Sequence, residues 1–149
     1  MAFVPADFDV PLRLETPDFV LEPLGPEHNE RDYAAWSSSK EHIQATPGWQ
    51  ESKSWPREMT LDENRADLER HANDFGNRSG FTYTVLEPES RDVIGCVYIY
   101  PLPDSDYDAR VLSWVRADRA ELDAPLWQRV GAWVDEAWPF ERVEYAPRR

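Results

Sequence analysis

Alternating apolar and polar side chains, or runs of β-branched and aromatic ones, mark five stretches of this chain as β-strands. The alternation in FVLEPLG, residues 19–25, predicts the first strand. FTYTVLE and DVIGCVYIYPL are rich in β-branched and aromatic residues, and the polar turn PESRD between them predicts a hairpin. ARVLSWV and the short RVEYA supply the last two strands.

A helical period marks two stretches between the first strand and the hairpin. In ERDYAAWSSSKEHIQ, the residues Tyr33, Trp36 and Ile43 share one face, which predicts one helix ended by the following Pro-Gly pair. In TLDENRADLERHANDF, Thr60 and Glu63 form a capping box, and the next glycine ends the helix. The stripe that this second helix would bury is Leu61, Leu68, Ala72 and Phe75.

A third helix is predicted between the last two strands. Asp123 suits its N-cap, Pro125 suits its first turn, and Pro139 ends it. Its predicted core-facing residues are Leu126, Val130, Trp133, Val134 and Ala137. The whole order is therefore β-α-α-β-β-β-α-β, which predicts a mixed α/β sheet.

Length and charge narrow the possible functions. The 149 residues suit one domain, which we place at 19–149 after an extended N-terminal segment, residues 1–18. A formal net charge of −13 leaves no basic face for nucleic acid. The same charge would attract cationic amines or basic peptides, with plain solubility as the alternative explanation.

Other features exclude further classes. The apolar runs are too short to predict a membrane span, and the N-terminus lacks the features of a signal peptide. Cys96 is the single cysteine, which excludes an internal disulfide and fits a reducing cytoplasm. The three histidines lack the spacing of metal ligands, so we expect no metal site.

The order of elements and two stretches of sequence resemble the Gcn5-related N-acetyltransferase (GNAT) family. VIGCVYI is similar to that family's third strand, and SWVRADR…VGAWVDEAW is similar to its fourth strand and third helix. The similarity extends over residues 19–145. It implies the acyl-CoA N-acyltransferase-like fold, with acetyl-CoA as co-substrate and an amine as acceptor.

The resemblance also implies where acetyl-CoA would bind. In the family, the fourth strand splays from the fifth, and its free backbone groups pair with the pantetheine arm. Those groups would lie at Trp114, Val115 and Ala117, with the Val115 amide polarising the thioester carbonyl. The next loop of the family is glycine-rich and presents backbone amides to the pyrophosphate. Arg116 and Arg119 are the cationic residues of that loop here.

Two departures from the family stand out. The phosphate-binding loop reads RADRAELDAP, which has no glycine and carries Asp118, Glu121 and Asp123, residues that would repel a phosphate. The family continues after its fifth strand with a helix, often bearing a tyrosine acid, and two more strands. This sequence stops at Arg149, so we expect a fold that lacks those last elements.

Acyl transfer needs a base for the amine and an acid for the leaving thiolate. Tyr98, Tyr100 and Tyr107 are the candidates for the acid, and Asp106 and Asp108 are the candidates for the base. Tyrosines and aspartates are also ordinary residues around the mouth of a hairpin, which is the structural explanation for all five.

The acceptor site of the family is shaped by its first helix and the loop that follows. The resemblance therefore places His42 and Trp49 beside the acceptor, together with Tyr100. The structural alternatives are a solvated histidine at a helix end and a tryptophan that covers the core. Cys96 alternates with its neighbours as a buried strand residue does, so it is not expected to be a nucleophile.

Two functions follow. The first is an acetyl-CoA-dependent N-acyltransferase acting on a small cationic amine or a protein N-terminus. The alternative is a catalytically reduced protein of the same fold that binds a ligand or a protein partner. The last strand would lie at an open sheet edge, so we also expect a homodimer that buries Tyr145 and part of the helix bearing Trp127 and Trp138.

Overall fold

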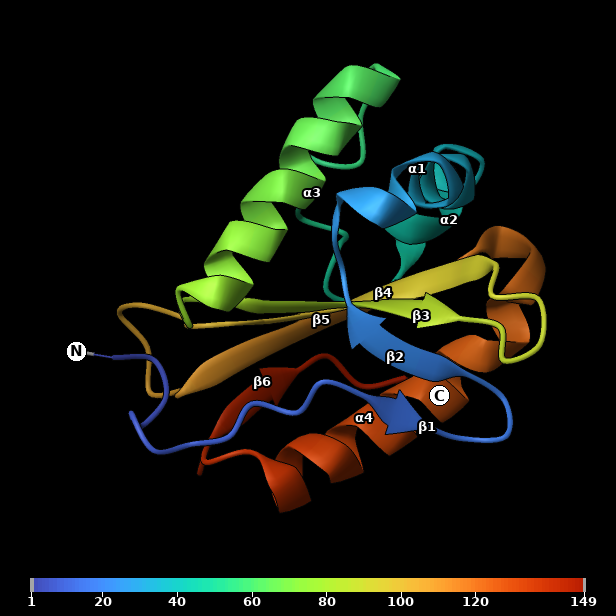
Figure 1. Ribbon diagram of the computed structural model, residues 1–149. Helices are drawn as coiled ribbons and strands as arrows, with labels where there is room; N and C mark the ends of the chain where they lie inside the picture. Colours follow the sequence, from blue (N-terminus) through green and yellow to red (C-terminus); the bar gives the residue numbers. More distant parts are fainter. Residues whose placement is uncertain (1, 149) are drawn as a thin grey trace.

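A computed structural model describes residues 2–148 of the chain. A six-stranded sheet with the order β1-β2-β3-β4-β5-β6 forms the middle layer. Helices α1, α2 and α3 cover one face, and α4 covers the other (Figure 1). The strands are β1 Leu14–Glu15, β2 Val20–Pro23, β3 Phe81–Leu86, β4 Val93–Tyr100, β5 Ala109–Val115 and β6 Val143–Tyr145. The helices are α1 Asn29–Ser37, α2 Lys40–Ala45, α3 Leu61–Gly76 and α4 Asp123–Ala137, with short 3-10 helices at Pro26–His28 and Ala117–Leu122.

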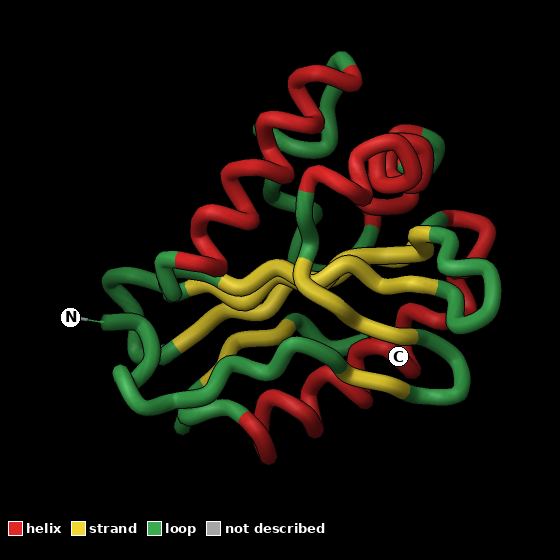
Figure 2. Tube along the Cα trace, viewed as in Figure 1, coloured by secondary structure: helices red, strands yellow, loops and turns green. Residues whose placement is uncertain are grey.

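The five predicted strands are confirmed, and the hairpin of β3 and β4 lies at the centre of the sheet. Neighbouring strands run antiparallel from β1 to β5, whereas β6 runs parallel to β5 after the crossover through α4. The short strand β1 was not predicted, since it lies in the segment 1–18. This segment packs below the sheet on the side of α4 (Figure 2), where the Tyr83 hydroxyl donates to the Pro11 carbonyl at 2.6 Å.

The single helix predicted for residues 30–44 is wrong, because the chain forms two helices that are interrupted at Ser38 and Ser39. The Ser38 hydroxyl donates to the Ala35 carbonyl at 3.0 Å, and the Ser39 amide donates to the Trp36 carbonyl at 2.9 Å. Serine side chains compete in this way for backbone groups and favour helix ends. The break buries Ser39, whose hydroxyl accepts from the Ala117 amide.

The capping box of α3 is confirmed: the Thr60 hydroxyl accepts from the Glu63 amide, and Glu63 accepts from the Thr60 amide. The predicted stripe is partly wrong, because Leu61 is 40% exposed. The buried residues of this helix are Asn64 and Leu68, so a polar side chain takes the inward position one turn into the helix.

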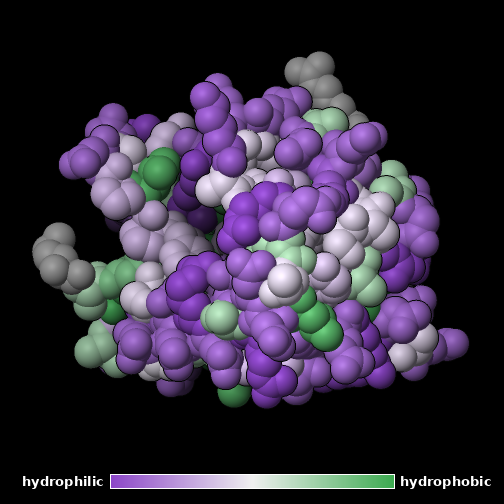
Figure 3. All heavy atoms as spheres, turned by 90° about the horizontal axis from the view of Figure 1, so that it is seen from above, coloured by the Kyte–Doolittle hydropathy of each residue, from purple (hydrophilic) through white to green (hydrophobic). Residues whose placement is uncertain are grey.

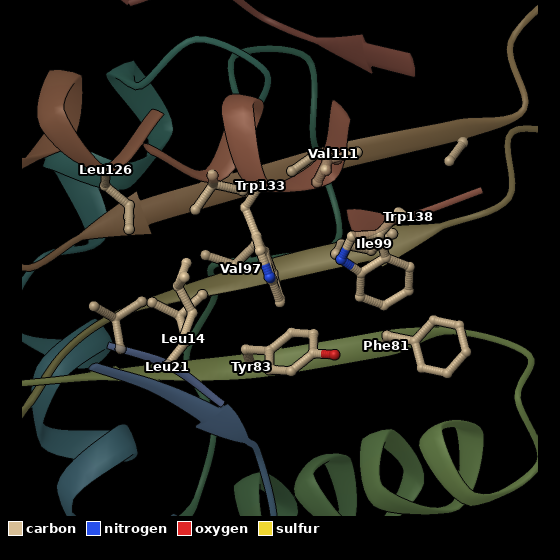
Figure 4. Close-up of a cluster of buried hydrophobic side chains, with 14 of the residues drawn as sticks. Leu14, Leu21, Phe81, Tyr83, Val97, Ile99, Val111, Leu126, Trp133 and Trp138 are labelled. Atoms are coloured by element: carbon tan, nitrogen blue, oxygen red, sulfur yellow. The ribbon is translucent and has the colours of Figure 1, made fainter. Parts of the chain in front are cut away.

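The start of α4 also differs from the prediction. Its N-cap is Leu122, because the 3-10 helix before it runs directly into α4, and Asp123 is the first helical residue. At the other end Ala137 is exposed, and Trp138 turns into the core in its place. Trp133 and Trp138 point from this layer toward Tyr83 and Phe81 on the sheet (Figure 4).

Gly95 on β4 leaves no space for a side chain beside β5, and it yields a testable prediction. A Cβ atom at Gly95 would lie 2.5 Å from the Trp114 carbonyl oxygen, so Gly95→Ala must push the two strands apart. We expect a loss of about 1–3 kcal/mol in the free energy of unfolding, measured with urea.

The control is Gly131→Ala in α4, where a Cβ would meet nothing within 4 Å. This change should stabilise the protein by about 0.5–1 kcal/mol, because alanine restricts the unfolded chain and favours helix. A neutral Gly95→Ala would contradict the close strand contact.

Candidate functional site

A cleft of about 370 Å³ opens between α1, α3 and the loop that joins α2 to α3. This volume lies in the range of small-molecule sites. The cleft belongs to the face that Figure 3 views from above, where most of the surface is hydrophilic. Its lining combines aromatic rings with polar groups, including Asp32, Trp49, Trp55, Asn64, His71 and Tyr98.

Asp32 of α1 is the buried carboxylate of the cleft, with only 4% of its surface exposed. Its Oδ2 atom accepts a hydrogen bond of 3.1 Å from the Asn64 amide group. Burial raises the pKa of Asp32 to about 6, although the bond from Asn64 acts in the opposite direction. Within residues 2–148, Asp32 forms no salt bridge, so a bound ammonium would be its first cationic partner.

Asn64 fixes the position of this carboxylate. Its amide nitrogen also donates to the Asn29 side chain at 2.8 Å, and its oxygen accepts from the Trp36 indole at 3.0 Å. The amide therefore ties α1 to α3 through buried side chains. Such a satisfied polar network holds a site in one geometry.

Aromatic rings form the floor and one wall of the cleft. The Trp55 ring lies 5.3 Å from the Trp49 ring, measured between ring centroids, and the Tyr98 ring of β4 lies 5.4 Å from Trp49. The Tyr98 hydroxyl accepts from the Trp114 indole at 3.0 Å. Burial raises the pKa of Tyr98 well above its usual value, so this phenol keeps its proton.

His71 of α3 lies at the far end of the cleft, beside Tyr100. The Tyr100 hydroxyl donates to Asp74 at 2.8 Å and lies 3.0 Å from the His71 Nδ1 atom. Burial, with a smaller effect of nearby Arg70, lowers the pKa of His71 to about 4, so the imidazole is neutral at physiological pH. Burial also raises the pKa of Tyr100 to about 12.

The edge of β5 is open next to this cleft. Among residues 2–148, β6 pairs with β5 only from Ala109 to Val111, and no described strand lies beside the last part of β5 on that side. The Ser113 carbonyl points toward the opening and accepts from the Trp49 indole at 2.9 Å. Backbone groups alternate in direction along a strand, so Val115 faces the same opening. We call the space between Ser113 and the end of β6 the β5–β6 opening.

The side chain of Arg148 fills this opening and is only 7% exposed. Its guanidinium donates to the Ser113 carbonyl at 2.8 Å, to the Ala146 carbonyl at 2.7 Å and to the Asp123 carboxylate at 2.9 Å. The Tyr145 ring lies 5.8 Å from the guanidinium carbon. Asp123 is therefore bound to Arg148. It does not cap α4, contrary to the prediction from the sequence.

The loop after β5 is compact and its arginines are paired. Arg116 lies 2.6 Å from Asp118 and donates to the Val93 carbonyl at 3.2 Å. Arg119 lies between Glu121, at 3.3 Å, and Glu87, at 3.6 Å. The hydrogen bond from Arg116 lowers the pKa of Asp118, which keeps this carboxylate ionised.

The structure separates some of the predicted site residues from the rest. Tyr107 and Asp108 lie before the first residue of β5, whereas Trp114 and Val115 end that strand about 20 Å away. The Asp108 carboxylate accepts from the backbone amides of Glu141 and Arg142, which lower the pKa of this side chain. The geometry thus gives Asp108 a structural role at the start of β6.

The other predicted residues divide in the same way. Trp49 and Tyr98 line the cleft, and Tyr100 contacts its lining residue His71. Exposed Asp106 lies in the loop with Tyr107. His42 lies on α2 outside the cleft lining, and its Nε2 atom is buried without a hydrogen-bond partner among the described residues.

Residues 2–148 contain neither a candidate metal site nor a candidate membrane-spanning helix. They hold no group of three or more His, Cys, Asp or Glu side chains arranged to bind a metal. None of their helices has the length and apolar character needed to cross a bilayer. Cys96 is completely buried, and burial raises the pKa of its thiol well above the usual value, as suits an unreactive core residue.

Sequence reasoning missed Asp32, His71 and Arg148. The available signal for Asp32 was weak: a charged residue between Tyr33 and the start of its helix looks solvent-exposed. Only the packing of α3 across α1 buries it. Arg148 had no local signal, because its contacts with Ser113 and Asp123 lie 35 and 25 residues away along the chain.

Sequence comparison assigns no family: no protein-family model matches the chain, and no curated protein matches it. Structural comparison does find similar proteins. The ribosomal-protein-S5-alanine acetyltransferase from Vibrio fischeri matches with a TM-score of 0.68 and 12% identity, over 92% of this chain and 73% of that one.

Two ligand-bound structures are also similar. MccE, the microcin C7 self-immunity acetyltransferase in complex with acetyl-CoA and AMP, matches with a TM-score of 0.61 and 12% identity, over 85% of this chain and 67% of that one. RimL, the ribosomal L7/L12 α-N-protein acetyltransferase in complex with coenzyme A, matches with a TM-score of 0.59 and 12% identity, over 84% and 67%. The chain therefore has the fold of the Gcn5-related N-acetyltransferases.

Proposed function

We propose that this protein transfers an acyl group from a coenzyme A thioester to an amine held in the cleft. One observation carries the proposal: Trp49 belongs to both halves of the site. Its ring lines the cleft, and its indole nitrogen donates to the Ser113 carbonyl in the β5–β6 opening. An amine in the cleft and a thioester on the edge of β5 would meet at this shared wall.

The cleft supports a small cationic amine as the acceptor. The buried Asp32 carboxylate would neutralise an ammonium group, and the Trp49 and Trp55 rings would favour it through cation–π attraction. Neutral His71 adds no competing charge. Arg70 also lines the cleft, but Asp67 and Asp74 lie 3.6 and 3.9 Å from it and offset its charge.

Two side chains suit the proton transfers. Burial raises the pKa of Asp32 to about 6, so its carboxylate is ionised at neutral pH. This pKa lies close enough to neutral pH for the carboxylate to accept a proton from the amine. Burial raises the pKa of Tyr98 well above its usual value, so the phenol keeps its proton, and we assign it as the acid for the leaving thiolate. These roles replace the base that the sequence had suggested at Asp106 or Asp108.

The edge of β5 fits the arm of the donor better than the following loop fits its phosphates. Ser113 and Val115 present backbone groups to the β5–β6 opening, and these would hold the pantetheine arm. The bound thioester would supply the acyl group. In the loop, the Ala117 amide is already bound to Ser39, which leaves the guanidinium groups of Arg116 and Arg119 as the counter-charges.

The test combines binding with transfer. Acetyl-CoA at 100 times its dissociation constant should stabilise the fold by about 2.7 kcal/mol, measured by thermal shift. Mass spectrometry should then detect acetylation of an arylalkylamine or an aliphatic diamine, with the matching alcohol as control. Peptides with a free N-terminal alanine belong in the same panel, because the similar Vibrio protein is named for a ribosomal-protein alanine. Absence of both binding and product would reject the proposal.

A second function is favoured by the loop after β5. Its glycine-free sequence and the carboxylates Asp118 and Glu121 disfavour a pyrophosphate at that place. A protein that binds an organic cation in the cleft without transferring an acyl group would show amine binding by calorimetry. It would show no stabilisation by acetyl-CoA and no product.

A further inference from the structure

We propose that the guanidinium of Arg148 is a displaceable stopper that closes the β5–β6 opening against the acyl donor. The proposal rests on the function proposed above, because it concerns access to the same donor edge. The stopper belongs to a short segment after β6, Ala146–Arg148, which we call the Arg148 arm.

Arg148 satisfies backbone groups on the edge of β5 in place of a strand. The Ser113 carbonyl accepts from the guanidinium at 2.8 Å, and the Ser113 hydroxyl lies 3.4 Å from the same Nη2 atom. Backbone groups on an open sheet edge are normally paired by another strand or an extended ligand. The guanidinium thus occupies the hydrogen-bonding position that an extended donor would need.

The pocket around Arg148 has hydrogen-bond acceptors that match a guanidinium. Its donors reach two carbonyl oxygens and the Asp123 carboxylate, in which the Oδ2 atom lies 2.9 Å from Nε. A buried arginine is stable only when its charge and donors are satisfied, and here they are. The Asp123 Oδ1 atom is also buried but has no partner within residues 2–148, so the carboxylate depends on Arg148.

The arm follows the part of β6 that pairs with β5. β6 has three residues, which pair only with Ala109–Val111, and the arm that follows it forms no strand. Pro147 is exposed. Opening the stopper would therefore break the guanidinium contacts without separating β6 from β5.

The stopper should lower the apparent affinity of the protein for the acyl donor. The apparent affinity of a site falls with the fraction of molecules in which it is open, so an arm closed in about 90–99% of molecules lowers affinity about 10- to 100-fold. Arg148→Ala should raise the affinity for acetyl-CoA by that factor, measured by calorimetry. The matched control is Arg129→Ala, which changes an exposed arginine of α4 and should leave the affinity unchanged.

A second variant controls for an effect on folding, because Arg148→Ala leaves Asp123 buried and unpaired. Arg148→Ala combined with Asp123→Asn removes both charges and should show the same increase in affinity. Ethylguanidinium gives an independent readout: it should raise the melting temperature of Arg148→Ala, compete with acetyl-CoA for that variant, and have neither effect on the wild-type protein.

The possible results test the stopper and the proposed acyl transfer separately. Equal acetyl-CoA affinity in the wild-type protein and both variants overturns the stopper alone and leaves the proposed function standing. Weaker binding by the folded variants also overturns it, since Arg148 would then be a donor-binding residue. No acetyl-CoA binding by any form rejects the proposed function, and the stopper falls with it even if ethylguanidinium binds.

Discussion

Replacing Asp32 with asparagine should abolish most acyl transfer and at the same time stabilise the protein. Asparagine has nearly the same shape, and its side-chain oxygen can still accept the hydrogen bond that Asn64 donates to Asp32. It cannot take a proton from the amine or neutralise an ammonium. Loss of a general base typically lowers the rate about 10²- to 10⁴-fold, so we expect a fall of that size in kcat/KM.

The stability gain follows from the raised pKa of Asp32. Between the usual pKa of 3.8 and the folded value of about 6, the folded protein holds a proton that the unfolded chain has released. The free energy of unfolding therefore falls as pH rises through this range and is lower above it by about 3 kcal/mol, at 1.36 kcal/mol per pKa unit. Asparagine removes this loss, so Asp32→Asn should gain up to about 3 kcal/mol at pH 8 and nothing below pH 3.

The measurement is urea unfolding at pH 3 and pH 8, paired with a pH profile of the transfer rate. The wild-type rate should increase as pH rises through about 6, because the ionised form of Asp32 is the one that accepts a proton. Glu30→Gln, an exposed carboxylate on the same helix, should change neither quantity. A destabilised Asp32→Asn protein, or one with normal activity, would remove Asp32 from the site.

The sequence carried enough information for the sheet and for one half of the site. Strand patterning depends on local alternation, so all five predicted strands, including β4 and β5, could be located. Trp49 and Tyr98 could be named because the position of a loop or strand relative to the sheet follows from the order of elements. The order came from the residue patterns, and the resemblance to a known family supplied the roles expected at these positions.

The rest depended on packing between distant segments. Asp32 is buried by Asn64, a polar residue one turn into α3 that no apolar pattern could reveal. The break between α1 and α2 depends on serine hydroxyls that capture backbone carbonyls, and serine is also tolerated within helices. Arg148 is charged and lies near the end of the sequence, yet it turns inward because it binds Ser113 and Asp123.

Packing within one chain also changes the predicted subunit interface, at Trp138. The sequence led us to place Tyr145 and part of the helix bearing Trp127 and Trp138 between two subunits. The structure corrects this for Trp138, which is 5% exposed within a single chain. Trp127 and Tyr145 do line a surface groove of about 490 Å³ between α4 and β6, so the predicted homodimer remains a prediction that concerns these two residues.

Trp138→Ala should therefore unfold much of the protein population, whereas Trp127→Ala should not. The Trp138 ring joins α4, the sheet and the N-terminal segment, since aromatic centroids surround it at 5.2–6.3 Å, from Phe8, Phe81, Tyr83, Trp133 and Phe140. Truncating a buried tryptophan costs about 3–5 kcal/mol, a large part of the roughly 5–15 kcal/mol that stabilises a domain.

Trp127 is the matched control on the same helix, because it is half-buried and makes an edge contact with Tyr145 at 6.2 Å. We expect Trp127→Ala to cost about 1 kcal/mol in urea unfolding at low protein concentration. Light scattering across a concentration series adds the second readout: loss of a dimer in Trp127→Ala, with its fold intact, would support the interface. Equal destabilisation by the two changes would contradict the division between core and surface, because it would mean that both rings stabilise a single chain to the same extent.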